Sequence, residues 1–142
     1  MRWMLIALCC AAVTPAVAAT PGAGRSLEGL IAVGDWTYVG NSDSTVMFVK
    51  PAPAEGPYAR VFVRFEDGIP FTRQDFSSLA SLEVDDVDCG GQRTRIVRSV
   101  RYAEHNMMGE SRADPIDMPV WKSEAPGSFG AGLLAHVCSS FQ

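Results

Sequence analysis

The chain has 142 residues and is slightly acidic, with 12 basic against 16 acidic side chains and a formal net charge of −4. This balance argues against sequence-independent binding to nucleic acid, which needs a cationic surface. The length suits one domain with a short leader. After the N-terminal apolar run, no stretch is long enough to cross a membrane, which takes about 20 apolar residues.

The first 19 residues are typical of a secretory signal peptide. Arg2 supplies a positive start, residues 3–13 are almost wholly apolar, and small residues around Ala18 supply a cleavage site. The apolar run is only about a dozen residues long, which is too short for an ordinary membrane span. We therefore expect an exported protein, periplasmic or extracellular, whose signal peptide covers residues 1–19.

The cysteines bear on both export and architecture. Cys10 lies where a bacterial lipoprotein signal would place its acylated cysteine, but that signal prefers a small residue before the cysteine, and here Leu8 and Cys9 precede the two candidates. An outer-membrane lipoprotein is therefore the less favoured alternative. After cleavage only Cys89 and Cys138 remain, and in an oxidising compartment they have one possible intramolecular connectivity. Such a bridge closes a loop of about 50 residues, worth about 4 kcal/mol in the chain-entropy model.

Residues 20–32 begin with a stretch rich in glycine, alanine and proline and are expected to form a flexible leader, with the folded domain over residues 33–142. A turn is expected at residues 66–70 and a loop over residues 106–119. Short β-branched and aromatic runs between turn residues predict the strands. These cover residues 35–39, 45–49, 58–65, 81–89 and 94–103, with a further short strand near 119–123.

The strand over residues 58–65 shows the clearest alternation of side chains. One face is apolar and the other is mixed: the first carries Ala59, Val61, Val63 and Phe65, and the second carries Arg60, Phe62 and Arg64. Exposed arginine and aromatic side chains are frequent interface anchors. We therefore expect Arg60, Phe62 and Arg64 to bind a partner on a sheet face that no helix covers.

The last element is expected to be a helix over residues 129–138. Ser128 is a suitable N-cap, and apolar side chains recur at three-to-four spacing to form one stripe that includes Cys138. Two glycines in the helix each cost about 1 kcal/mol relative to alanine, so the helix needs docking onto the sheet. The sequence thus predicts an α+β fold, an antiparallel sheet of about five to six strands with this helix docked on one face and tethered by the Cys89–Cys138 disulfide.

Four acidic residues precede the Gly90-Gly91 turn and four arginines follow it. The acidic residues are Glu83, Asp85, Asp86 and Asp88, and the arginines are Arg93, Arg95, Arg98 and Arg101. The carboxylates could bind a hard cation, but cross-strand charge pairing is the simpler interpretation, so we expect no metal site. A two-residue loop predicts three ion pairs: Asp88–Arg93, Asp86–Arg95 and Glu83–Arg98.

The sequence carries no recognisable catalytic motif. It has no Gly-x-Ser-x-Gly elbow and no Gly-x-Gly-x-x-Gly or Walker loop, and its two remaining cysteines suit a disulfide better than a thiolate nucleophile. We therefore expect no catalytic residues and no cofactor. His105 with Met107 and Met108 leaves one alternative open, a carrier of a small ligand, haem or a metal that uses this methionine-rich loop.

Several of these features together resemble the surface-adhesin protein E family. The resemblance rests on Trp36-Thr37-Tyr38-Val39, Val87-Asp88-Cys89 followed by arginines and Val100-Arg101-Tyr102, and Trp121 before Pro126-Gly127-Ser128 and a helix that ends in Val137-Cys138. It extends from about residue 33 to residue 139 and implies a small secreted bacterial protein with an antiparallel sheet and a disulfide-tethered C-terminal helix. It also implies an adhesin-like, non-enzymatic binding module that holds a protein partner, such as a host or envelope macromolecule. The oligomeric state is left open.

Overall fold

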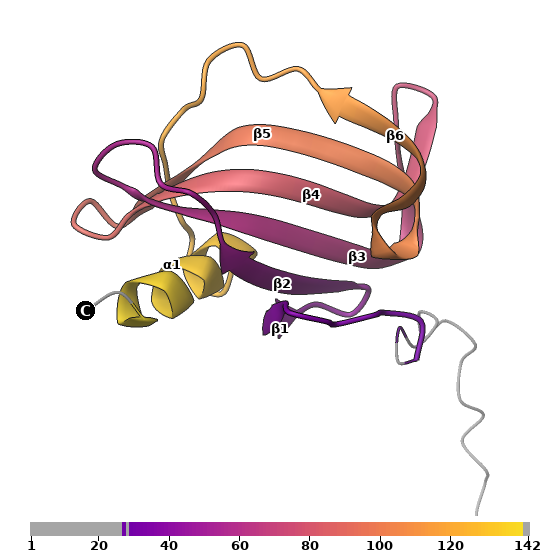
Figure 1. The fold of residues 1–142 in the computed structure, drawn as a ribbon, viewed down its shortest axis with the longest axis horizontal. Coiled ribbons are helices and arrows are strands. Elements are labelled where there is room, and N and C mark those ends of the chain that lie inside the picture. Colours follow the sequence, from indigo (N-terminus) through magenta and orange to yellow (C-terminus); the bar gives the residue numbers. More distant parts are fainter. Residues whose placement is uncertain (1–26, 28, 141–142) are drawn as a thin grey trace, which may run out of the picture.

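The computed structural model describes residue 27 and residues 29–140, so the predicted signal peptide and part of the predicted leader lie outside the described residues. The described chain forms an antiparallel sheet with one helix against it (Figure 1). In chain order its elements are β1 (Thr37–Asn41), β2 (Thr45–Pro51), β3 (Ala59–Arg73), β4 (Phe76–Asp88), β5 (Arg93–Glu104), the 3-10 helix η1 (His105–Met107), β6 (Met108–Asp114), β7 (Lys122–Ser123) and α1 (Phe129–Ser140). This architecture confirms the predicted fold class.

The sheet is built from consecutive hairpins. Each of the strands β1 to β5 pairs with the next strand in sequence, and every pairing is antiparallel, so no crossover connection is needed. The short strand β7 also pairs with β5, near its start, whereas β6 pairs with the later part of β5. Figure 1 shows the connection after β6 arching away from the sheet before the chain returns to α1.

The turn predicted at residues 66–70 is wrong. β3 and β4 continue past it, and the chain reverses at Gln74 and Asp75, whose φ angles of 51° and 59° lie in the left-handed region. The pairing of β3 with β4 shifts between Glu66 and Phe71, so the turn-like residues form a bulge within the hairpin. Glycine and proline serve bulges as well as turns, and this is why the sequence pattern misplaced the reversal.

The loop predicted over residues 106–119 is also wrong in part, because β6 lies inside it. Asn106 and Met107, with φ angles of 62° and 60°, turn the chain so that it runs back along β5. Every residue of β6 except Asp114 is exposed. The strand therefore lacks the alternation of apolar and polar side chains by which a sequence predicts a strand.

The core lies between α1 and one half of the sheet. Leu133, Leu134 and Val137 of the helix are buried against a floor of strand side chains, and full burial of each such side chain contributes about 1.5–3 kcal/mol. The floor consists of Met47, Val49, Val61, Val63 and Val87. The predicted apolar face of β3 is therefore the face that meets the helix.

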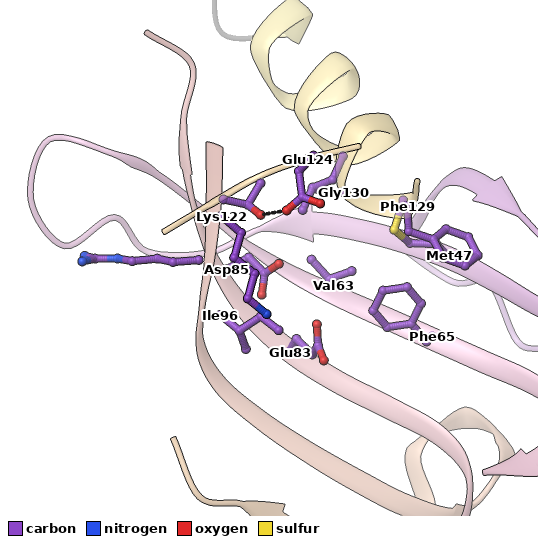
Figure 2. Close-up of a pocket in the computed structure, with 13 residues that line it drawn as sticks. Met47, Val63, Phe65, Glu83, Asp85, Ile96, Lys122, Glu124, Phe129 and Gly130 are labelled. Atoms are coloured by element: carbon purple, nitrogen blue, oxygen red, sulfur yellow. Dashed lines mark hydrogen bonds between the residues drawn. The ribbon is translucent and has the colours of Figure 1, made fainter. Parts of the chain in front are cut away.

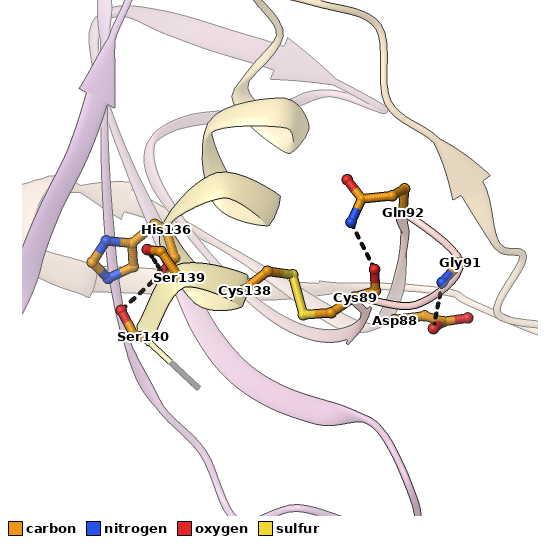
Figure 3. Close-up of a disulfide and its surroundings, with 8 residues drawn as sticks. All are labelled: Asp88, Cys89, Gly91, Gln92, His136, Cys138, Ser139 and Ser140. Atoms are coloured by element: carbon orange, nitrogen blue, oxygen red, sulfur yellow. Dashed lines mark hydrogen bonds between the residues drawn. A yellow bond between two sulfur atoms is a disulfide. The ribbon is translucent and has the colours of Figure 1, made fainter. Parts of the chain in front are cut away.

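Both ends of α1 are fixed. At the N-terminus, the Ala131 N–H donates to Ser128 Oγ at 3.1 Å, so Ser128 is the N-cap that the sequence predicts. Near the C-terminus, Cys138 forms the predicted disulfide with Cys89 in the β4–β5 turn, with Cα atoms 5.6 Å apart (Figure 3). The bridge ties the helix to a hairpin 49 residues earlier in the chain. No helix within the described residues has the length and apolarity to cross a bilayer.

Candidate binding surfaces

Two parts of the sheet lie outside the contact with α1. The first is the face opposite the helix, which we call the far face; residues 30–36 cover part of it. The second lies on the face that α1 packs against, which we call the helix side. It is formed mainly by β4 and β5, beside the start of α1. The side chains on these two surfaces differ in character.

An apolar strip lies at the centre of the far face. Phe62 of β3 lies opposite Val84 of β4, which lies opposite Arg98 of β5, and in the next row Leu82 lies opposite Val100. Directly opposite residues of antiparallel strands share a face of the sheet. We call these five residues the far-face strip; its four apolar side chains are half-buried, and Arg98 is exposed.

Arg64 is buried and is not the exposed anchor that the sequence predicts. It is 2% exposed, and its Nε donates to Glu66 Oε1 at 2.6 Å. Its other guanidinium nitrogens donate to Ala32 O at 2.9 Å and to Asn106 Oδ1 at 2.8 Å. Asn106 also accepts from the Ala32 N–H and donates to Leu30 O. The last residues of the predicted leader are therefore hydrogen-bonded to the domain.

Arg60 is also engaged within the fold. Its Nε donates to Asp86 Oδ1 at 2.7 Å and its Nη1 lies 2.7 Å from Glu55, and these bonds raise the pKa of Arg60 above its ordinary value. Burial opposes the ionisation of Asp86, but hydrogen bonds from Arg60 and Arg95 outweigh it and lower the pKa of Asp86. Of the three predicted anchors, the structure presents Phe62 on the uncovered sheet and uses Arg60 and Arg64 to brace it.

Arginine and aromatic side chains continue at one end of the far face. The guanidinium carbons of Arg93 and Arg95 lie 4.9 and 4.5 Å from the centre of the Trp121 ring, and Tyr58 meets this ring edge to face at 4.7 Å. Such cation–π contacts are worth about 0.5–2 kcal/mol each. Periodicity could not reveal this cluster, because Trp121 follows an irregular connection and reaches the arginines only through the pairing of β7 with β5.

Two of the three predicted cross-strand ion pairs are confirmed, each at 2.8 Å: Asp88–Arg93 and Asp86–Arg95. The predicted pair Glu83–Arg98 is wrong. The register shifts between Val84 and Asp85, so that Arg98 lies opposite Val84 and Glu83 lies opposite Ser99. This bulge leaves Glu83 and Asp85 on the helix side of the sheet without an arginine opposite them.

Glu83 and Asp85 line a cavity beside the start of α1, which we call the acidic groove (Figure 2). The cavity has a volume of about 200 Å³, and Lys122 of β7 and Glu124 also line it. Its apolar lining consists of Met47, Val63, Phe65, Ile96, Phe129 and Leu133. Carboxyl groups thus share a confined space with aliphatic and aromatic side chains.

Burial makes both groove carboxyls hard to ionise. It raises the pKa of Glu83 to about 7, with a further contribution from Asp114, and raises the pKa of Asp85 to about 8, with contributions from Glu83 and Glu124. Lys122 lowers both pKa values but is outweighed. Asp85 is 5% exposed, and its Oδ1 is the one buried side-chain nitrogen or oxygen without a hydrogen-bond partner among the described residues.

Glu124 reaches the groove because Gly130 makes room for it. A Cβ atom at position 130 would overlap the Glu124 carboxylate. The Thr94 hydroxyl donates to Glu124 Oε1, which holds the carboxylate at the edge of the groove. In the sequence Gly130 looks like a helix-weakening residue; the close approach of a carboxylate is what requires it.

The methionine-rich loop gives no support to the carrier alternative. His105 Nδ1 lies 3.0 Å from Glu66 Oε2, so the imidazole is already engaged with an internal carboxylate. Met107 is half-buried, whereas Met108 is 60% exposed, so the two thioethers lie in different environments. Within the described chain, no group of three or more histidine, cysteine, aspartate or glutamate side chains is arranged to hold a metal ion.

Comparison with solved structures finds a similar fold in a known protein. Two solved structures of Haemophilus influenzae protein E are similar to it. Crystal form II gives a TM-score of 0.58 at 10% identity and covers 76% of this chain and 90% of that chain. The second structure gives 0.57 at 10% identity and covers 76% and 86%. At this identity the likeness concerns the fold alone.

A search of curated proteins finds no match. The sequence model of Surface-adhesin protein E, in contrast, matches residues 36–139, which is most of the chain and includes every strand and nearly all of α1. The chain therefore belongs to the surface-adhesin protein E family.

Proposed function

We propose that this protein is an exported, adhesin-like binding protein without enzymatic activity, and that it holds a protein partner on the far face. Membership of the surface-adhesin protein E family supports a binding role. The single observation that supports the location is the far-face strip, an apolar sheet surface that α1 does not cover. A sheet face of this kind is usually packed against another layer, and among the described residues only residues 30–36 cover part of it, so the strip is available to a partner.

The surroundings of the strip suit a protein interface. Lys50 flanks Phe62 on one side, Arg98 closes the row on the other, and the arginines stacked on Trp121 lie at one end. Interfaces commonly combine an apolar centre with a polar rim, with arginine and aromatic side chains as anchors. Lys50, Arg93 and Arg95 are paired with Asp35, Asp88 and Asp86, whereas Arg98 forms no ion pair among the described residues. The rim therefore predicts a partner with an acidic group that meets Arg98 beside an apolar patch.

Arg60 and Arg64 have a supporting role in this proposal. Both guanidinium groups are bonded to buried carboxylates, Asp86 and Glu66, which are 1% and 0% exposed. Removing one member of a buried ion pair costs about 3–5 kcal/mol. Substitution of either arginine is therefore expected to destabilise the domain, so the binding test uses exposed or half-exposed positions instead.

Retention of a partner by matched variants tests the proposal. The immobilised mature domain is exposed to envelope extract and culture supernatant of the producing organism, and separately to purified extracellular-matrix proteins. The double variant Phe62→Ser/Arg98→Ser should retain roughly tenfold less of any protein that the natural domain holds, since it removes an apolar anchor and a cation from the strip.

The control is Met118→Ser/Arg73→Ser, which removes one apolar side chain and one arginine that are both exposed and lie outside the far-face strip. It should retain the partner fully, and melting curves should show that both variants fold. Equal retention by the natural domain and Phe62→Ser/Arg98→Ser would refute the assignment of the far face. If only the control variant fails to retain the partner, the partner contacts the other side of the sheet.

Export is tested separately by the intact mass of the protein recovered from the producing organism. The apolar run and the small residues around Ala18 predict a chain that starts at Ala19 or Thr20. An acylated chain that starts at Cys9 or Cys10 would show a lipoprotein instead.

A further inference from the structure

The acidic groove lies outside the far-face strip, and the binding role proposed above makes no use of it. Its two central carboxyls, Glu83 and Asp85, occupy alternate positions of β4 and so point to the same side of the sheet. Sequence alone does not mark them as a pair with a shared role, because Asp86 and Asp88, which follow them, are also acidic but point the other way and bond to arginines.

The unpartnered oxygen of Asp85 is available to a hydrogen-bond donor in the groove. Asp85 is 5% exposed and lines the cavity, yet its Oδ1 accepts no hydrogen bond. Leaving a buried polar group unpaired costs about 1–3 kcal/mol. None of the ion pairs within 4 Å among the described residues joins Lys122 to Asp85 or Glu83, so this exposed lysine does not take the place of a bonded partner.

The lining of the groove specifies the chemistry of that ligand. Within the described chain, the groove is lined by three carboxyl groups and one free cation: Glu83, Asp85 and Glu124 against Lys122. Arg95 also borders the cavity, but its charge is paired with Asp86. Once Glu83 and Asp85 are ionised, the carboxylates outnumber Lys122, and this negative excess calls for a cation. The apolar lining would leave a hydrated metal ion without ligands over most of its surface, and the described carboxylates form no group suited to a metal. An organic cation fits both parts of the lining.

We propose that the acidic groove binds a primary ammonium group carried on a short apolar stem. The ammonium donates hydrogen bonds to Asp85 and Glu83, and the stem packs against Phe129 and Ile96. A free small amine and the side chain of a lysine share this chemistry, so either source satisfies the geometry.

The groove has an apolar entrance. A second hollow of about 280 Å³ adjoins it and shares Glu83, Ile96 and Lys122 with it. The connection between β6 and β7 lines this hollow with Met118 and Val120, which are 82% and 63% exposed. An apolar stem can therefore enter beside this connection while its charged end reaches the carboxyls.

Binding should strengthen as the carboxyls ionise. The groups that face them are Asp114, Lys122 and Glu124, with Arg101 held by Asp114 at 2.8 Å and Arg73 at the far border of the adjoining hollow. Since burial raises the pKa of Glu83 to about 7 and of Asp85 to about 8, an ammonium must displace their protons. Affinity for an amine should therefore rise between about pH 6 and pH 8.5.

Calorimetric titration of the mature protein with phenethylamine tests the proposal, with 2-phenylethanol as the uncharged counterpart. Phenethylamine should bind saturably and 2-phenylethanol roughly tenfold more weakly or not at all. Asp85→Asn should weaken the amine roughly tenfold, whereas Lys122→Gln should strengthen it several-fold because it removes the competing cation. Asp88→Asn is the matched control, since this carboxylate is bonded to Arg93 outside the groove, and it should leave the affinity unchanged.

Any of the following outcomes would overturn the proposal. Equal affinity for amine and alcohol would show an apolar pocket without recognition of charge, and an unchanged affinity in Asp85→Asn would remove the anchoring carboxyl. Saturable binding of Ca²⁺ that depends on Asp85, without binding of the amine, would show a metal site. Absence of any saturable binding would show that the carboxyls serve no ligand of this kind.

Two further measurements define the ligand and separate this proposal from the adhesin-like role. Nα-acetyl-lysine amide carries the lysine side chain; if it binds as tightly as phenethylamine, a lysine of a peptide is the source, and if it does not, a free amine is. The variant Phe62→Ser/Arg98→Ser should bind phenethylamine as the natural protein does. Loss of partner retention therefore tests the adhesin-like role, and loss of amine binding tests the acidic groove, each independently of the other.

Discussion

Asp85 and Asp86 are neighbours in sequence but lie in opposite environments. Asp86 accepts hydrogen bonds from Arg60 and Arg95 on the far face, whereas Asp85 points into the acidic groove and its Oδ1 has no partner. Both are nearly inaccessible to solvent, at 1% and 5% exposed. The alternation of a β-strand therefore makes one carboxyl a structural anion and the other a group that the fold prefers to keep protonated.

This contrast predicts opposite effects of two adjacent substitutions on stability. In the folded state Asp85 has a pKa of about 8 against 3.8 in an unfolded chain, so the folded protein binds a proton that the unfolded chain releases, and the free energy of unfolding falls as pH rises through that window. Asp85→Asn should raise the free energy of unfolding by about 1–3 kcal/mol near pH 8 and change it little below about pH 4. Urea unfolding at several pH values measures both.

Asp86→Asn is the matched control with the opposite sign. Hydrogen bonds from Arg60 and Arg95 outweigh burial and lower the pKa of Asp86, so its contribution is present above about pH 4 and is lost as pH falls through the lowered folded-state pKa. The variant should lose about 1–3 kcal/mol at neutral pH because two half-buried guanidinium groups lose their shared carboxylate partner. A stabilising Asp86→Asn, or a destabilising Asp85→Asn at about pH 8, would contradict the two environments.

Gly130 and Gly132 offer a second contrast between neighbours, this time in α1. Replacing an interior helix glycine by alanine gains about 1 kcal/mol from propensity. At Gly132 a Cβ atom would lie 3.8 Å from Val39, an ordinary contact, so Gly132→Ala should stabilise the protein by up to about that amount. At Gly130 the Cβ would overlap the Glu124 carboxylate and displace it from Thr94, so Gly130→Ala should raise the melting temperature less than Gly132→Ala does, whereas Gly130→Ala/Glu124→Ala avoids this overlap. Equal shifts for the two single variants would argue against the packing of Glu124 on the helix.

The helix as a whole depends on its tether and its docked face. Cys138→Ser with Cys89→Ser removes the covalent link and should lower the free energy of unfolding by about 2–5 kcal/mol, as loss of a native bridge from a small domain does. Urea unfolding of the natural and variant proteins measures the difference. Thiol titration of the unreduced, unfolded mature protein should find no free thiol; two free thiols would reject the bridge in protein taken from an oxidising compartment.

Sequence patterns predicted some helices and strands correctly and missed others. The alternation of Val61 and Val63 predicted the face of β3 that meets the helix, and Ser128 with the cysteine pair predicted both ends of α1, because these signals depend on local geometry or on a single possible pairing. β6 escaped prediction because its side chains are nearly all exposed, and a strand at the edge of a sheet needs no apolar alternation.

The candidate sites were harder to predict because they depend on contacts between distant segments. Arg64 is buried by Ala32, Glu66 and Asn106, which no periodic pattern relates to one another. The bulge after Val84 places Ser99, and not Arg98, opposite Glu83. A shift of one residue in register changes the side chain that each residue meets on the neighbouring strand. The sequence predicted the correct sheet face for Phe62 but could not show which of its neighbours would already be bonded.

The whole molecule presents two surfaces of different character. The far face carries an apolar strip with exposed Arg98 and an arginine cluster around Trp121, and the helix side carries the acidic groove with Glu83 and Asp85. A protein partner with acidic groups suits the first surface, and a small ammonium group suits the second.

Site-specific photo-crosslinking tests the central claim, that a protein partner docks on the far face, most directly. A photoreactive amino acid replaces Arg98 in one variant and Met118 in another; both positions are exposed, and only the first lies in the far-face strip. After irradiation in the producing organism or with a purified matrix protein, the claim predicts a discrete crosslinked product from position 98 and none from position 118. A product from position 118 alone would contradict it.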